Sequence, residues 1–288
     1  MKIYKVLPEL NKRRHLSLWH KALRGQWSAE EINWGAPHRM LSDATKRGLA
    51  NVLTPILMGE QAALYSVSAL IPILGQTSEV ESQFYLTTWA VDEVRHTELF
   101  TRFYGRIGKE PLPIRRFPSG YLFQSSIVST EPADWLAGVL VSEVLASLAM
   151  HEFKRLDLDP CLSEIARGIL EDEARHLAFN HIYLEDRFSE HYQKSHEGGK
   201  TFSEHLRQRM RSVLATVPAI LDTLAPDLKE IGVDPDALFQ KLSEECMQRL
   251  DRSATAGSNV AAGVLSSKLA DKVERASEGE VPSISHSN

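Results

Sequence analysis

Apolar residues recur with a helical period along most of the chain, and no segment shows the strict apolar and polar alternation of a strand. The pattern predicts four long helices, which span about residues 42–74, 79–105, 130–156 and 161–189. Pro55 lies inside the first of them, where we expect a kink or a division. Thr130-Glu131-Pro132 is a typical helix start for the third.

The loops between these helices differ in length. The first two helices, and the last two, are joined by short turns, but the middle connection is long and contains Pro111, Pro113, Pro118 and Gly120. Short loops make neighbouring helices antiparallel. We therefore expect an all-α fold, a four-helix bundle built from two hairpins and one long crossover.

The segments outside the bundle are less regular. Residues 1–40 read as an N-terminal extension with a helix start at Ser28, and its tryptophans pack it onto the bundle. Residues 41–252 form the main domain, with two added helices near 201–224, where Pro218 can break the helix, and 235–252. Residues 253–288 are rich in Ser, Ala and Gly, and we expect the last part of this tail to be disordered.

Bulk composition excludes several classes. The chain has 288 residues, of which 43% are hydrophobic and 25% charged, as in soluble globular proteins. A net charge of −5 gives no basic surface for nucleic acid. The uncharged stretch between Glu60 and Glu79 reads as a buried helix, so no membrane association is expected. Two cysteines give no disulfide framework and the N-terminus has no signal-like apolar run, which favours the cytoplasm.

One five-residue phrase occurs twice, as Asp92-Glu93-Val94-Arg95-His96 and as Asp172-Glu173-Ala174-Arg175-His176. A lone glutamate precedes each copy: Glu60 stands 33 residues before Glu93, and Glu143 stands 30 residues before Glu173. We expect each copy by chance in roughly one of a few hundred chains, so the repetition indicates function. The alternative is two amphipathic helices that share a charged, solvated face.

The spacing predicts a shared site. Residues three apart lie on one face of a helix, and positions about 30 apart in a hairpin sit at one level. The phrases and lone glutamates therefore bring four carboxylates and two imidazoles together among apolar residues. Two divalent ions would cancel the four negative charges, and mixed carboxylate and imidazole ligands suit iron or manganese better than calcium. The predicted ligands are Glu60, Glu93, His96, Glu143, Glu173 and His176.

The remaining charged residues of the phrase have a supporting role in this interpretation. A metal-bound imidazole usually donates its second N–H to a carboxylate, a carbonyl or water. Asp92 and Asp172 would each accept from the histidine of the opposite hairpin, and Arg95 and Arg175 would neutralise them. The alternative is a set of ordinary surface salt bridges.

On these motifs the chain resembles the ferritin-like di-iron carboxylate superfamily, including bacterial di-iron hydroxylases, arylamine N-oxygenases and ribonucleotide reductase small-subunit-like oxidases. The resemblance implies a ferritin-like fold and two iron ions, with manganese and iron as the alternative pair. It also implies that Glu93 and Glu173 bridge the metals. Ser147 matches a hydroxylase threonine, and with Phe100 and Trp89 it marks the expected oxygen and substrate pocket.

Four positions depart from special features of these relatives. Phe100 stands where reductase subunits commonly place a radical tyrosine. Ala63 and Gly138 stand where the ligand-binding oxidases form a Tyr–Val crosslink, and Ile169 where arylamine N-oxygenases have an extra histidine. These departures disfavour a radical-storing subunit.

The expected function is an O2-activating di-iron oxygenase or oxidase that hydroxylates a small organic substrate at carbon or nitrogen. It would need an electron donor, a ferredoxin or a flavoprotein reductase, and we expect a homodimer. The alternatives are a one-electron oxidase like the reductase small subunit with a Mn/Fe or Fe/Fe centre, an iron-storage protein, and a purely structural helical protein.

Overall fold

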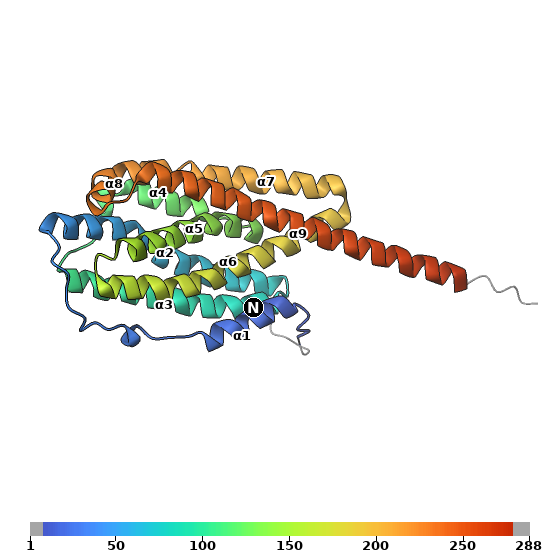
Figure 1. The fold of residues 1–288 in the computed structure, drawn as a ribbon. Helices are drawn as coiled ribbons and strands as arrows, with labels where there is room; N and C mark the ends of the chain where they lie inside the picture. The colour runs from blue at the N-terminus through green and yellow to red at the C-terminus, as the bar shows by residue number, and fades with distance from the viewer. Residues whose placement is uncertain (1–7, 279–288) are drawn as a thin grey trace, which may run out of the picture.

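The computed structural model describes residues 8–278. Within this range the chain forms α-helices and two short 3₁₀ helices, and no strand (Figure 1). The all-α prediction is confirmed. The α-helices are α1 (Arg13–Arg24), α2 (Asp43–Gln76), α3 (Val80–Ile107), α4 (Pro118–Ile127), α5 (Pro132–Leu156), α6 (Pro160–Lys194), α7 (His196–Leu214), α8 (Val217–Ile231) and α9 (Pro235–Glu278).

Four long helices, α2, α3, α5 and α6, form the central bundle. α2 packs along α3, and α5 packs along α6, so the two predicted hairpins are present (Figure 1). α1 lies along α3 and α6, whereas α7, α8 and α9 cover the other side of the bundle. Pro55 and Pro72 lie inside α2, which is one continuous helix, so the predicted division at Pro55 is absent.

Side-chain caps set where the central helices begin. The Ser42 hydroxyl accepts the backbone N–H of Thr45 at the start of α2. Asp159 accepts the N–H of Cys161 at the start of α6, where Pro160 takes the first position. Arg106, near the end of α3, forms a buried ion pair with Asp159 at 3.0 Å. This pair connects the end of α3 to the start of α6.

The crossover between α3 and α5 is partly helical. We predicted a long connection there from its prolines and glycine, and it contains the 3₁₀ helix η2 (Ile114–Arg116) and α4, which we did not predict. Pro118 is the first residue of α4, where its missing N–H leaves no helical hydrogen bond unmade. α4 packs against α2, α5 and α8 and so lies beside two ligand-bearing helices.

The C-terminal helices depart further from expectation. α7 begins at His196, earlier than predicted, although the break before Pro218 falls where we expected it. We predicted that the last helix ends near residue 252 and that a tail follows, but α9 continues to Glu278. Its small residues permit close packing: a Cβ on Gly257 would lie only 2.5 Å from Phe188 Cβ of α6. The disorder expected at the very end concerns residues 279–288, which lie outside the described part.

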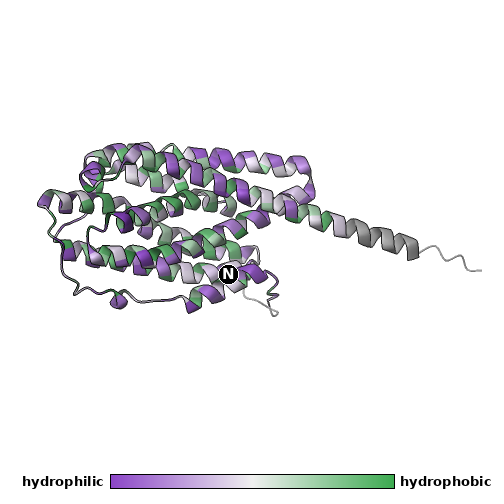
Figure 2. Ribbon diagram, viewed as in Figure 1, coloured by the Kyte–Doolittle hydropathy of each residue, from purple (hydrophilic) through white to green (hydrophobic). Residues whose placement is uncertain are grey.

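Two described helices, α2 and α5, are long and apolar enough to cross a membrane. Apolar residues concentrate where the central helices meet (Figure 2). The most apolar window of α5 is 67% buried and that of α2 only 28%, so α2 also presents apolar surface. Both helices carry a glutamate of the site described below. The expected absence of membrane association stays a prediction.

Candidate metal centre

Six donor side chains meet in the interior of the four-helix bundle. None is more than 4% exposed. The helical period aims each of them inward from its own helix. The six are Glu60 of α2, Glu93 and His96 of α3, Glu143 of α5, and Glu173 and His176 of α6.

The donors form two overlapping groups. His96 Nδ1 lies 3.1 Å from Glu60 Oε2, and the ligand atoms of Glu60, Glu93 and His96 all lie within 4.8 Å of one another. His176 Nδ1 lies 3.1 Å from Glu143 Oε2. Glu93, Glu143 and His176 meet the same 4.8 Å limit. Glu93 belongs to both groups, so the two groups share a side chain.

Glu93 and Glu173 occupy the middle of the arrangement. Glu93 Oε2 lies 3.7 Å from His96 Nδ1, and its Oε1 lies 3.6 Å from His176 Nδ1. Glu173 Oε2 lies 3.7 Å from His176 Nδ1, and its Oε1 lies 4.0 Å from His96 Nδ1. Each carboxylate therefore reaches both histidines. This is the position that a bridging ligand needs, although the bridging assignment itself stays a prediction.

The aspartates of the repeated phrase contact the far side of each imidazole. His96 Nε2 lies 3.1 Å from Asp172 Oδ2, and His176 Nε2 lies 3.3 Å from Asp92 Oδ2. An ionised carboxylate only accepts, so each Nε2 carries the hydrogen and donates. The contacts cross between the two hairpins, as the sequence predicts. Each Nδ1 is thereby turned toward the glutamates.

Arg95 and Arg175 contact the same two aspartates, and these four side chains form an outer layer behind the histidines. Each pairs with the aspartate three residues before it on its own helix. Arg95 Nη2 also donates to Asp172 Oδ2 at 2.8 Å, and Arg175 Nη2 to Asp92 Oδ2 at 3.4 Å. Because all four side chains are buried, surface salt bridges are excluded as their description.

Two residues of the N-terminal extension join the same layer, and our sequence reasoning missed their role. Gln26 Nε2 donates to Asp92 Oδ1 at 3.0 Å, and the Trp27 indole N–H donates to Asp172 Oδ2 at 3.0 Å. The Arg95 guanidinium lies 4.8 Å from the centre of the Trp27 ring. The tryptophans of this stretch indicated packing, but their hydrogen-bond partners lie too far away in the sequence to be inferred.

Trp89 holds one of the central carboxylates. Its indole N–H donates to Glu93 Oε1 at 2.6 Å, and its ring stacks on His176 with 4.5 Å between centroids. Trp89 is fully buried. It contacts two donors directly and is not among the residues that line the cavity described below, so its predicted place in the oxygen and substrate pocket stays a prediction.

Burial and like charge act on the central glutamates. Burial first, and then the Glu60 carboxylate, raise the pKa of Glu93 to about 7. Burial and the Glu143 carboxylate likewise raise the pKa of Glu173 well above its ordinary value. In the protein alone, full ionisation of this cluster is therefore unfavourable, and added positive charge would stabilise the carboxylates.

The opposite effect dominates in the outer layer and at the imidazoles. Burial alone would raise the pKa of Asp92, but the hydrogen bond and charge of His176, with Arg95, bring it below its ordinary value. For His96, burial alone would lower the pKa, but the surrounding carboxylates, chiefly Glu60 and Asp172, raise it. The aspartates therefore stay ionised and keep their histidines oriented.

The donor set fits a pair of divalent metal ions. Glu60 Oε1, Glu93 Oε2 and Glu173 Oε2 are buried and have no hydrogen-bond partner within the described part of the chain. Buried oxygens without partners are unusual in native proteins unless an ion or water satisfies them. Four carboxylates and two imidazoles balance four positive charges, and their mixed chemistry suits iron or manganese. This arrangement is the one known in ferritin-like carboxylate bundles.

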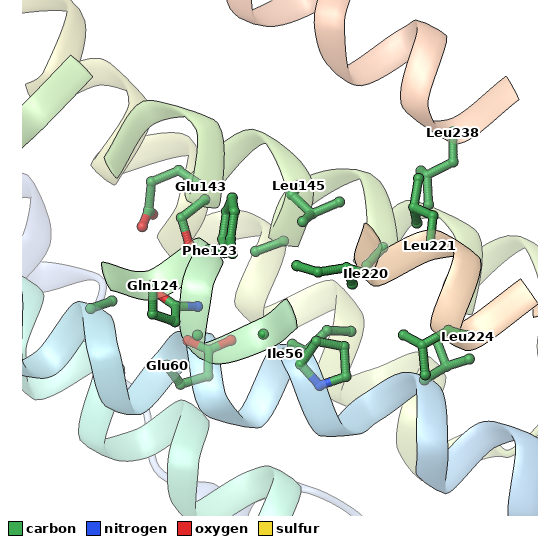
Figure 3. Close-up of a pocket in the computed structure, with 18 of the residues that line it drawn as sticks. Ile56, Glu60, Phe123, Gln124, Glu143, Leu145, Ile220, Leu221, Leu224 and Leu238 are labelled. Carbon is green, nitrogen blue, oxygen red and sulfur yellow. The ribbon is translucent and has the colours of Figure 1, made fainter. Parts of the chain in front are cut away.

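A narrow cavity opens on the centre from the side of α2 and α5 (Figure 3). Glu60, Glu143 and Glu173 form one end of its lining. The rest is largely apolar and comes from α2, α4, α5 and α8, with Leu238 of α9. Neither α4 nor this use of α8 was foreseen from the sequence.

The remaining predicted pocket residues do not line this cavity. Phe100 is fully buried in the hydrophobic core. Ser147 lines a separate cavity between α5, α6 and α9, together with His151 and His181. Ser147 is four residues after Glu143, but Ser142, Leu145 and Ala146 are the residues of α5 that turn toward the centre's cavity. Phe100 and Ser147 are therefore absent from the lining of this cavity, although we expected them in the oxygen and substrate pocket.

The fold and the donor set together define a ferritin-like protein with a dinuclear carboxylate centre. The chain belongs to the family described as P-aminobenzoate N-oxygenase AurF, whose sequence profile matches residues 68–221, more than half of the chain. It is a di-iron oxidoreductase of the oxygenase and oxidase class. The predicted superfamily is therefore confirmed. No curated protein matches the sequence.

Solved structures of similar fold point the same way. An R2-like ligand-binding oxidase with an aerobically reconstituted Mn/Fe cofactor superposes with a TM-score of 0.68 at 16% identity, covering 87% of this chain and 98% of its own. The R2-like ligand-binding oxidase with aerobically reconstituted metal cofactor after photoconversion gives 0.66 at 16%, covering 87% and 99%. At this identity the likeness establishes the fold.

Proposed function

We propose that the protein is an O2-dependent di-iron monooxygenase that hydroxylates a small organic substrate at carbon or nitrogen. One observation supports this most: a largely apolar cavity ends on three of the six donors, so a substrate can reach the metal site. One oxygen atom of O2 would enter the substrate and the other would leave as water. This balance needs two electrons, which we assign to a ferredoxin or flavoprotein reductase as donor, and two protons, which come from the solvent.

The residues that would hold the metals follow from the two donor groups. Glu60, Glu93 and His96 would hold one ion, and Glu143, Glu173 and His176 the other, with Glu93 and Glu173 shared. When bound, an iron pair supplies the one-electron and O2 chemistry that no protein side chain provides.

The chain's own contribution is to orient donors and exclude water. Asp172 and Asp92 keep the Nε2 hydrogens on His96 and His176, which leaves each Nδ1 lone pair for a metal. The Trp89 indole N–H fixes Glu93 Oε1. The apolar lining of the cavity limits the water that reaches the centre, which protects reactive species from side reactions.

A second candidate is a one-electron oxidase with a Mn/Fe pair. An R2-like ligand-binding oxidase of similar fold carries such a cofactor. Phe100 argues against a stored tyrosyl radical, because the phenylalanine at the place expected for a radical tyrosine has no phenol group to oxidise. Elemental analysis with electron paramagnetic resonance after O2 exposure separates the two: stoichiometric manganese with iron supports the oxidase, and iron alone supports the monooxygenase.

Location and assembly belong to the same proposal. We place the protein in the cytoplasm, where soluble electron donors are found. Tyr65 on α2 and Val91 and Val94 on α3 are more than half exposed on two helices that pack together, which supports a homodimer through this face. Sedimentation of the full chain tests it, with the dimer mass expected.

Oxygen uptake tests the proposed activity directly. Protein loaded with iron(II) and reduced chemically should consume O2, and a bound substrate should appear with one added oxygen atom in the mass spectrum. Iron-loaded protein that consumes no O2 after reduction would refute the proposal. Uptake without any oxygenated product from a broad set of ligands would favour the oxidase.

A further inference from the structure

The cavity beside the metal centre is elongated. Along α2 its lining runs from Val52 to Ala63, which at the helical rise is about 16 Å. Leu221 and Leu224 of α8 and Leu238 of α9 lie away from Glu60 and Glu143 (Figure 3). The cavity thus has a carboxylate end, formed by the proposed metal ligands, and a long apolar end.

No cationic side chain lines this cavity. Among residues 8–267, whose side chains the structure describes, its only ionisable groups are the three glutamates of the centre, and no Lys, Arg or His belongs to the lining. A negatively charged group on a ligand, placed in the apolar end, would lose its water and gain no opposite charge. Such burial is strongly unfavourable, whereas a neutral group loses much less.

Two neutral polar side chains stand at the carboxylate end. Gln124 of α4 and Ser142 of α5 both line the cavity, and Figure 3 shows Gln124 beside the labelled Glu60 and Glu143. A Cβ placed on Gly59 would lie 3.7 Å from Gln124 Nε2 and 4.0 Å from Ser142 Oγ. The two groups therefore converge on the residue before Glu60.

Both polar groups are available to a ligand. Neither side chain has a hydrogen-bond partner among residues 8–267, whose side chains the structure describes, whereas Gln26, Trp27 and Trp89 on the other side of the centre all donate to its carboxylates. An amide and a hydroxyl can both donate and accept. They suit a neutral group such as an amine, a hydroxyl or a carbonyl. Gly59 leaves room for it, because it has no side chain of its own.

We propose that Gln124 and Ser142 select a neutral substrate: they hold one polar group beside Glu60, and the substrate's apolar body extends toward α8 and α9. This inference rests on the proposed function, because it assigns the cavity to the substrate. It also separates this chain from the substrate in its family's name. p-Aminobenzoate, with its amine beside the glutamates, would place its carboxylate among leucines.

A matched pair of ligands tests the charge argument. 4-Butylaniline and p-aminobenzoate share the amine and the ring, but only the second carries a carboxylate. Calorimetric titration of the iron(II)-loaded full chain without O2 measures binding with no turnover. We expect 4-butylaniline to bind at least about tenfold more tightly. Equal or tighter binding of p-aminobenzoate, or no binding of either compound, would overturn the proposal.

A matched pair of variants tests the polar anchor. Ser142→Ala and Ser147→Ala remove the same hydroxyl from the same helix, but only Ser142 lines this cavity. We expect Ser142→Ala, and more strongly Gln124→Leu, to weaken 4-butylaniline binding by about threefold to tenfold, with unchanged iron content. Ser147→Ala should bind as the parent does. Equal effects of both serine variants would overturn the assignment.

The proposed O2-dependent function and the proposed substrate selection by the cavity can be refuted separately. Oxygen uptake by reduced iron-loaded protein without ligand tests the proposed function. Ligand binding in the absence of O2 tests the cavity. Normal uptake with preferred binding of p-aminobenzoate would remove only the inference about Gln124 and Ser142. Normal binding without uptake would remove only the oxygenase.

Discussion

The two sides of the metal centre have opposite character. On the histidine side, Asp92, Asp172 and their arginines form a buried network in which Gln26 and Trp27 also donate hydrogen bonds. On the glutamate side, an apolar cavity reaches the donors, and its two neutral polar residues have no partner in the described structure. One side therefore fixes the geometry of the ligands, and the other is where we place the substrate.

Loss of a shared ligand should have the largest effect. Glu93→Ala removes the carboxylate that belongs to both donor groups, so we expect most of the bound metal to be lost from both positions. Glu98→Ala is the matched control, because Glu98 lies on the same helix but is exposed and pairs with Arg102 at the surface. Elemental analysis of both variants decides it, and full metal retention in Glu93→Ala would refute the ligand assignment.

Metal removal should destabilise the protein next most strongly. Each ion that binds only the folded state at a hundred times its Kd adds about 2.7 kcal/mol, so two ions add about 5.4 kcal/mol, or a rise in Tm of about 9 °C for a chain of this size. Scanning calorimetry of metal-free and iron-loaded protein measures this. Equal Tm values would argue for a purely structural helical protein.

The metal-free protein should also have a characteristic pH dependence. Burial and Glu60 raise the folded-state pKa of Glu93 to about 7 from an ordinary 4.5. Between these values the folded state binds more protons than the unfolded chain, so its stability falls as pH rises from about 4.5 to 7. Metal keeps the carboxylates ionised and should abolish this fall. A metal-free protein whose Tm increases over the same range would contradict the account.

The histidine side should respond more mildly to loss of a supporting hydrogen bond. Trp27→Phe keeps an aromatic ring but removes the donor to Asp172, and we expect metal affinity to fall about tenfold. Trp34→Phe is the control. Trp34 also lies beside an arginine, Arg102, but its N–H donates to the Ala29 carbonyl away from the centre. Competition with a chelator measures both affinities, and equal values would assign Trp27 to packing alone.

The smallest effect should come from the cavity side. Gly59→Ala adds a methyl at ordinary contact distance from Gln124 and improves helix propensity, so we expect Tm to rise about 1–3 °C while ligand binding weakens. Gly105→Ala, which also lies inside a helix and has open space around it, should raise Tm without changing binding. If Gly59→Ala bound 4-butylaniline as tightly as Gly105→Ala, Gly59 would not border the binding site.

The six donor residues could be predicted from the sequence because residues three apart on a helix share one face, and residues about 30 apart in a hairpin sit at one level. Two copies of the phrase, 33 and 30 residues after two lone glutamates, determine which helix faces meet. The crossed contacts of Asp92 and Asp172 follow from the same register. Trp27 was not predictable in this way, since its partner Asp172 is 145 residues distant and no period relates them. The sequence predicted that the N-terminal extension packs onto the bundle, but it did not predict the hydrogen bonds of Gln26 and Trp27.

The cavity was even less accessible to prediction. Gln124 lies on α4, a helix hidden in a stretch whose prolines and glycine indicated a loop. Ser147 matched a relative's motif, yet its neighbours Ser142 and Ala146 take the face that borders the cavity. Which face of α5 borders the cavity depends on how α4 and α8 pack over the bundle, and no short sequence pattern indicates this packing.

The most direct measurement is the number of metal ions bound per chain, taken with the optical spectrum before and after O2 reaches the reduced protein. The account predicts about two ions per chain, both lost in Glu93→Ala, and an absorption change when O2 is added. One ion per chain, or two ions that both persist in Glu93→Ala, would contradict a single centre built from the repeated phrase.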